Sequence, residues 1–316
     1  MKKIILSMLA LAALAGCSKS EEDSQGGNGG PEGLVPIRLG SGVAMVTKAP
    51  VTDATSFTAG IAGWENTATE DFSGNPTWNT TIQTVPPTPA EPEGDDAGAQ
   101  EMDVTWTAQK YYNADEGTTT YMKAWYPAGT LSGTTVIFEN TEASVDVLLA
   151  PVVSGTKLTK DAPDKVLAFA HQTAQINFKV QAGDGLAENT TLRSITIRDA
   201  QLPTGFDLTK EIADAVTYAE AADLAVPGIT ADDITIGETA EAAGSPVMIK
   251  PITGKTFSID VVTSGATYSN QTVTVTSENI EAGTAYDVTL TFGQGGIKLK
   301  ATVAPWKSET GSADIK

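Results

Sequence analysis

Residues 286–303 read YDVTLTFGQGGIKLKATV, and this stretch decides the fold class. Apolar side chains occupy every second position from Tyr286 to Phe292, and the positions between them carry Asp and Thr. This alternation is typical of a strand with one buried face, because successive side chains of a strand point to opposite sides. The Gly-Gln-Gly-Gly run at 293–296 favours a turn. The sequence therefore predicts an antiparallel hairpin with Tyr286, Val288, Leu290 and Phe292 in the core.

The same alternation recurs along the chain and predicts an all-β protein. The clearest further strands are residues 175–180, 257–261 and 272–275, and others are expected at 56–64, 104–112, 121–126, 136–138, 145–149 and 195–197. Helix signals are confined to residues 209–225, where Val216-Thr217-Tyr218 interrupts a run rich in Ala and acidic residues. The 30 Gly and 16 Pro residues fit a chain with many turns. We therefore expect β-sandwich architecture.

The composition excludes several functional classes. The 316 residues include 20 Lys and Arg against 39 Asp and Glu, and the net charge of −19 disfavours nucleic-acid binding, because phosphate contacts need a basic surface. With one Cys and one His, the chain can form no internal disulfide and no metal site that needs several such ligands. No nucleophile motif accompanies His171, so we expect a structural histidine at the start of a strand, hydrogen-bonded to a neighbouring loop. We expect neither an enzyme nor a bound cofactor.

The N-terminus has the features of a bacterial lipoprotein signal. Lys2 and Lys3 precede an apolar stretch, residues 4–14, that is too short to span a bilayer as a stable helix. It ends Leu14-Ala15-Gly16-Cys17, like a lipobox, at the only cysteine of the chain. We expect removal of residues 1–16 and lipidation of Cys17, with an ordinary signal peptide as the alternative. Acyl chains would anchor the protein to a membrane, and the polar residues 17–33 would form a flexible tether.

Two composition shifts predict loops and a domain boundary. Residues 85–99 hold four Pro and several acidic residues, which favours an exposed loop within the first domain. Residues 151–164 hold Gly155, Pro163 and several charges, which favours a second loop. We place the boundary there. The expected domains are residues 34–164, whose first strand covers about 34–48, and residues 165–316.

Acidic clusters and tryptophans supply the remaining candidate sites. The clusters at 91–96 and 232–233 lack the spacing of a known calcium loop, so we interpret them as solvent-exposed loop charge. A glycosidase with paired carboxylates stays open, because sequence alone cannot pair carboxylates across strands. Trp78 precedes a polar run, and we expect it to be an exposed platform that could stack on a ligand such as a sugar. Three tryptophans in apolar patterns are expected in the core: Trp64, Trp106 and Trp125.

Three stretches, together with the lipobox and tether, resemble the fimbrillin family of Bacteroidales, pilus subunits made from lipoprotein precursors. Residues 35–50 (VPIRLGSGVAMVTKAP) are similar to the family's first strand and processing segment. Residues 167–178 (LAFAHQTAQINF) are similar to the opening of its second domain. Residues 286–306 are similar to its closing hairpin and tryptophan. The expected fold is then two tandem antiparallel, transthyretin-like β-sandwiches.

The resemblance also implies a route of assembly. A trypsin-like protease would cut after a basic residue beyond the first strand, and another pilus subunit would fill the exposed groove with its own strand. Lys48, between Thr47 and Ala49, is the best match for the cut site, and Arg38 is the alternative inside the expected strand. We expect the apolar alternation of this strand to change phase at residues 40–42, where a bulge could sit. The precursor is expected in the cell outer membrane and the mature form in a surface pilus.

The role within a pilus and one competing function stay open. Residues 307–316 offer only Ala313 and Ile315 as alternating apolar residues, which fits a tip or accessory subunit that accepts a strand without donating one. The leading expectation is a structural or adhesive pilus subunit whose partners are other subunits and host or bacterial surface ligands. The alternative is a non-pilus surface lipoprotein that binds glycans or protein ligands.

Overall fold

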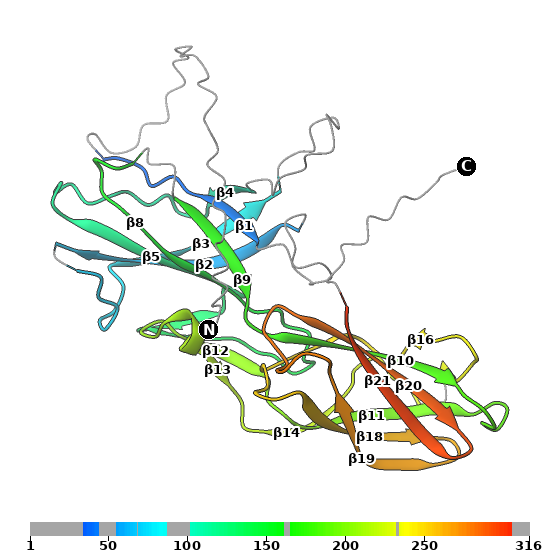
Figure 1. Ribbon diagram of the computed structural model, residues 1–316. Helices are drawn as coiled ribbons and strands as arrows, with labels where there is room; N and C mark the ends of the chain where they lie inside the picture. Colours follow the sequence, from blue (N-terminus) through cyan, green and yellow to red (C-terminus); the bar gives the residue numbers. More distant parts are fainter. Residues whose placement is uncertain are drawn as a thin grey trace, which may run out of the picture. The chain divides into compact units, whose positions relative to one another are not determined.

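The computed structural model describes residues 34–43, 55–67, 69–86, 102–160, 165–231 and 234–304 (Figure 1). Over these residues the protein consists of β-strands and one short helix, α1 (Ile212–Ala215), so the predicted all-β class is confirmed. Within the same ranges, no helix has the length and apolar character needed to cross a membrane. Nor do three or more His, Cys, Asp or Glu side chains gather there in a group that could hold a metal ion.

The first sheet comes from the N-terminal half of the chain and closes on itself. Its order is β1-β4-β3-β2-β5-β8-β9, and β9 pairs with β1 to complete the closed sheet. The member strands are β1 (Gly40–Val43), β2 (Phe57–Asn66), β3 (Trp78–Val85), β4 (Met102–Trp106), β5 (Thr119–Tyr126), β8 (Leu148–Gly155) and β9 (Val166–His171). Alternate residues of these strands point inward, as in β9, where Leu167, Phe169 and His171 are buried.

Two further sheets come from the C-terminal half of the chain and share one core. One has the order β16-β10-β20-β21 with β17 beside β10, and the other has the order β14-β11-β18-β19 with β15 beside β11. Their strands are β10 (Ala174–Ala182), β11 (Thr191–Ala200), β14 (Ala222–Ala225), β15 (Ile234–Thr235), β16 (Glu241–Ala242), β17 (Val247–Ile249), β18 (Thr256–Thr263), β19 (Thr267–Thr274), β20 (Ala285–Gly293) and β21 (Gly296–Ala304). Buried side chains from both sheets form a single cluster, as expected for a sandwich.

A small antiparallel sheet joins residues from both halves of the chain. Its order is β13-β12-β7-β6, built from β6 (Thr130–Ser132), β7 (Thr135–Ile137), β12 (Pro203–Asp207) and β13 (Val216–Tyr218). Gly205 allows the close approach of β12 to β7, because a Cβ at this position would lie 2.1 Å from the Val136 carbonyl oxygen. Phe206 and Leu208 from this region pack in one cluster with Trp64 and Trp125 of the first sheet.

The strongest strand predictions are confirmed. Tyr286–Phe292 falls in β20, β21 pairs with it across the 293–296 turn, and all four expected core residues are fully buried. Residues 175–180, 257–261 and 195–197 fall in β10, β18 and β11. The expected core positions of Trp64 and Trp125 are also confirmed, whereas Trp106 is only half-buried.

The predicted loop at 151–164 is wrong in its first part, because β8 continues through Pro151 to Gly155. The register with β5 shifts here: Ala124 pairs with Ala150, whereas Met122 pairs with Val153. The extra residue on β8 makes a bulge, where a proline without an N–H group is tolerated. The boundary placed at residues 164 and 165 stays a prediction, and β9, which follows it, pairs with β8 and β1 of the first sheet.

Candidate functional site

The segment of residues 34–43, here named the first-strand segment, is held by two separate hydrogen-bonded stretches. In the first stretch, residues 35–37 run against residues 110–112. The Ile37 N–H donates to the Lys110 carbonyl over 2.9 Å, and the Tyr112 N–H donates to the Val35 carbonyl over 2.9 Å. The Gln109 side-chain amide adds a bond of 3.0 Å to the Ile37 carbonyl. The segment is therefore fixed before β1 begins.

In the second stretch, β1 lies between β4 and β9 and closes the first sheet. It runs antiparallel to β4, with Ser41 opposite Met102, and parallel to β9, with Gly40–Val43 in register with residues 166–169. The Gly40 N–H donates to the Lys165 carbonyl over 3.0 Å, which extends the contact with β9 by one residue. Without β1, both β4 and β9 would present unpaired backbone groups.

The inward side chains of the first-strand segment follow an unbroken alternation. Ile37 and Ser41 have no exposed surface, Val43 has 5%, and Val35 and Leu39 pack partly buried against the same core cluster. The register of β1 with β9 also shows no shift. The predicted change of phase at residues 40–42 is therefore wrong, because Ser41 takes an interior position that the apolar pattern did not mark.

Tyr112 is a buried polar residue beside this segment. Its side chain belongs to the cluster that contains Ile37, and burial raises the pKa of its hydroxyl to about 12. The Lys165 ammonium lies 5.7 Å from the centroid of its ring and donates to the Thr159 carbonyl. Gly155 leaves room for both side chains, because a Cβ there would lie 2.6 Å from Lys165 Cε and 2.8 Å from the Tyr112 hydroxyl oxygen.

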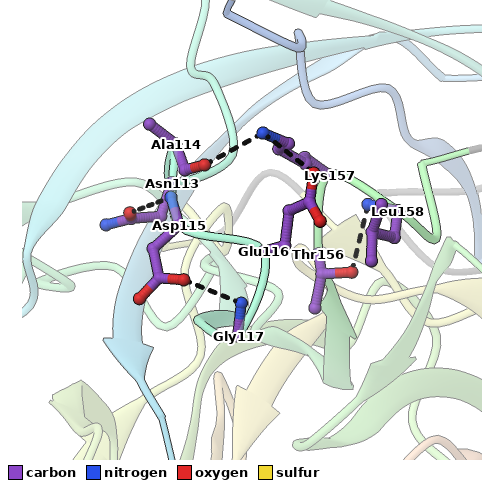
Figure 2. Close-up of polar contacts among 8 residues, drawn as sticks. All are labelled: Asn113, Ala114, Asp115, Glu116, Gly117, Thr156, Lys157 and Leu158. Carbon is purple, nitrogen blue, oxygen red and sulfur yellow. Dashed lines mark hydrogen bonds and ion pairs between the residues drawn. The ribbon is translucent and has the colours of Figure 1, made fainter.

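Two loops next to these residues are tied to each other (Figure 2). The Lys157 ammonium donates to the Ala114 carbonyl over 3.0 Å and forms an ion pair of 3.3 Å with Glu116. Asp115 stabilises the turn of its own loop, because its carboxylate accepts a hydrogen bond of 3.0 Å from the Gly117 N–H. The loop after Tyr112 and the loop after β8 are thus joined next to residues 110–112, which pair with the first-strand segment.

The two predicted cut sites fall in different surroundings. Arg38 is exposed, but the hydrogen bonds of Ile37 and Gly40 hold the backbone on either side of it. Lys48 belongs to the connection between β1 and β2 and lies outside the described residues, as does Cys17. The acidic clusters at 91–96 and 232–233 and the tail at 307–316 also lie outside them.

Trp78 is half-buried rather than exposed. It opens β3 and packs against the core of the first sheet, over Gly63, where a Cβ would lie 2.3 Å from its ring. Its ring centroid lies 6.1 Å from that of Trp106, and the Lys110 ammonium lies 5.8 Å from its centroid. Ligand binding at this ring stays a prediction.

His171 has the structural contact that was expected. It lies at the end of β9, so its predicted position at the start of a strand is wrong. Its Nδ1 lies 3.0 Å from Oδ1 of Asp146, in the loop before β8. Both side chains are fully buried. The pair therefore fastens the end of β9, the strand against which β1 lies.

Sequence reasoning missed three residues that define the site: Ser41, Met102 and Tyr112. Ser41 interrupts an apolar run, and Met102 and Tyr112 lie far along the chain from their partners in the first-strand segment. Only the strict parity of positions 35, 37, 39, 41 and 43 could have marked Ser41 as an inward residue.

A solved structure with a TM-score above 0.5 supports the fold. A protein from Bacteroides uniformis, described as a cell-adhesion candidate, shares 17% identity with a TM-score of 0.54 over 87% of this chain and 100% of its own. A fimbrial protein from Bacteroides vulgatus shares 15% identity, with a TM-score of 0.45 over 85% and 99%. A C-terminally truncated tip fimbrial protein from Porphyromonas gingivalis shares 9% identity, with a TM-score of 0.42 over 86% and 98%.

Comparison with sequences identifies the family. No curated protein sequence matches the chain. The sequence profile of the fimbrillin-like family, in contrast, matches residues 47–306, which is well over half of the chain. The match begins just after the first-strand segment and extends beyond β21. The chain therefore belongs to the fimbrillin-like family.

Proposed function

We propose that the chain is a structural or adhesive subunit of a cell-surface pilus and that it assembles by exchange of its first strand. Membership of the fimbrillin-like family supports the role in a pilus. The observation that carries the assembly route is the position of β1, a four-residue strand that closes the first sheet between β4 and β9.

Loss of the first-strand segment would create a groove suited to another strand. The backbone groups of β4, β9 and residues 110–112 would lose their partners, which is the situation that β-strand addition repairs. The space left by Ile37 and Val43 would offer apolar pockets at alternating positions. Backbone hydrogen bonds would then give affinity for an incoming strand, and the pockets would select its side chains.

Proteolysis at Lys48 is the proposed trigger. Lys48 follows β1 and precedes β2, so a cut there separates the strand from the chain without breaking a described strand. Arg38 is the weaker alternative, because a protease must draw several residues into an extended conformation, and hydrogen bonds hold the backbone next to it. A trypsin-like protease suits either site.

The proposed precursor is a lipoprotein of the cell outer membrane. Lipidation at Cys17 would anchor it, and the polar residues 17–33 would separate the folded part from the lipid. A cut after Lys48 would remove both, so the mature subunit would be held in the pilus by its neighbours alone. Adhesion to a surface ligand, with Trp78 as one candidate contact, belongs to the same proposal.

The proposed domain division is residues 34–164 and 165–316, with transthyretin-like sandwiches in both. One feature supports it: the two large core clusters share no residue, although the first includes Leu167 and Phe169 from beyond residue 164 and the second includes Ala143. The proposal includes a structural role without catalysis, which is supported by the family and by a sequence in which His171 is the only histidine.

The test is the double variant Lys48→Ala with Arg38→Ala, expressed in the native cells. The expected result is a folded, lipid-tethered monomer and loss of the high-mass ladders that polymers leave on gels. The matched control is Lys255→Ala, which removes an exposed lysine outside the first sheet and should leave the ladders unchanged. Ladders of normal intensity from the double variant would refute strand exchange and favour a non-pilus surface lipoprotein that binds glycans or proteins.

A further inference from the structure

The first-strand segment presents side chains of unequal size to the interior. Positions 35, 37 and 39 carry Val, Ile and Leu, and position 43 carries Val. Ser41 stands between them and, like Ile37, has no exposed surface. The row of inward positions therefore contains one slot that holds a small side chain.

Large buried neighbours flank this slot on both sides. Ser41 is in register with Met102 of β4 and with Leu167 of β9, which are 1% and 0% exposed. The Ser41 hydroxyl donates to the Met102 carbonyl over 3.4 Å. Side chains in register on neighbouring strands start about 5 Å apart, and protein interiors are close-packed. A longer side chain at position 41 would therefore compete with Met102 and Leu167 for interior space.

The next position has no such limit. A Cβ added to Gly42 would meet no atom within 4 Å, and Gly42 is not among the described glycines with a positive φ angle. Adjacent positions of one strand therefore differ sharply in the size that they accept. A slip of two residues would bring Leu39 into the slot, and a slip of one would turn the apolar side chains outward.

We propose that the Ser41 slot sets the register and the partner of strand exchange. The incoming strand is a segment of another pilus subunit with Gly, Ala or Ser at the position of Ser41. It carries a β-branched aliphatic residue two positions later, where Val43 lies, and aliphatic residues two and four positions earlier. This inference rests on the proposed function, because it concerns the strand that replaces the first-strand segment.

The test offers labelled peptides to the full chain after cleavage at Lys48 under native conditions. The reference peptide has the natural sequence of residues 34–46, and two others carry Ser41→Val or Gly42→Val. Because overpacking a core costs enough to change an equilibrium by roughly tenfold or more, the Ser41→Val peptide should be incorporated at least about tenfold less than the reference. The Gly42→Val peptide should stay within about twofold of it.

The outcomes separate the slot from the wider proposal. If the reference and both variant peptides are incorporated equally, the slot is refuted and strand exchange stands. If no peptide is incorporated, including the reference, strand exchange itself is refuted and the slot with it. Since the folded chain is unchanged in every arm, a folding defect cannot produce either result.

Discussion

Replacing Ile37 with Ala tests whether the first-strand segment is held by its buried side chains. Ile37 has no exposed surface and lies in the core cluster of the first sheet. Removing a buried Ile side chain to Cβ typically costs about 2–5 kcal/mol of stability. In the intact chain this loss should lower the unfolding midpoint by about 4 °C or more.

In a chain cut at Lys48, the same loss should speed release of the strand. The strand is then held by its hydrogen bonds and buried side chains alone, and even 2 kcal/mol corresponds to roughly 30-fold in a binding equilibrium. The assay attaches a fluorophore to the strand and follows its release on addition of excess unlabelled peptide of residues 34–46. Faster release by about this factor is expected.

The matched control is Arg38→Ala, because Arg38 neighbours Ile37 in sequence and its side chain is exposed. It should leave both the midpoint and the release rate close to those of the natural chain. Equal release by Ile37→Ala and Arg38→Ala would refute the reasoning, since the interior contacts of the strand would then contribute nothing to its retention.

Three further predictions concern the core, alkaline pH and the anchor. Phe292→Ala should lower the unfolding free energy by about 3–5 kcal/mol because the ring is fully buried, whereas Val303→Ala at a 47% exposed position should change it little; equal midpoints would contradict the core assignment. Burial raises the pKa of Tyr112 and Tyr218 to about 12, so between pH 10 and 12 the folded chain keeps protons that the unfolded chain loses, and stability should fall as pH rises through this window. An unfolding free energy that stays constant in denaturant melts across that window would contradict this prediction. Cys17→Ser should remove the precursor from the membrane fraction or leave its signal uncut, and unchanged fractionation would argue against lipidation.

Local alternation was enough to predict the hairpin of β20 and β21. Its buried face follows from Tyr286 through Phe292, and the glycines at the turn mark where the chain reverses. A hairpin joins neighbours in sequence, so nothing distant is needed to define it. The same reasoning located most of β2, β5 and β18.

Pairing between distant strands could not be predicted in this way. The parallel pairings of β1 with β9 and of β10 with β20 join residues more than 100 positions apart. Alternation predicts which side chains of a strand share a face, but it does not predict which other strand pairs with it. The closed first sheet, on which the candidate site depends, is therefore a finding of the structure alone.

Ser41 and Pro151 show why residue type misled at single positions. The stretch Gly40-Ser41-Gly42 suggested a bulge, yet the Ser41 hydroxyl donates to the Met102 carbonyl and the strand stays regular. Gly155, Pro163 and several charges suggested a loop from residue 151 onward, yet β8 continues through Pro151, which lies at a register shift where a strand tolerates it. For Ser41 the hydroxyl has an acceptor on β4, and for Pro151 the bulge removes the need for a ladder hydrogen bond.

N-terminal sequencing of subunits sheared from the surface of native cells tests the central claim most directly. If a cut after Lys48 frees the first strand for exchange, the polymerised subunit should begin at Ala49. A subunit that begins with acylated Cys17 would contradict the account, because the first-strand segment would still be joined to the chain.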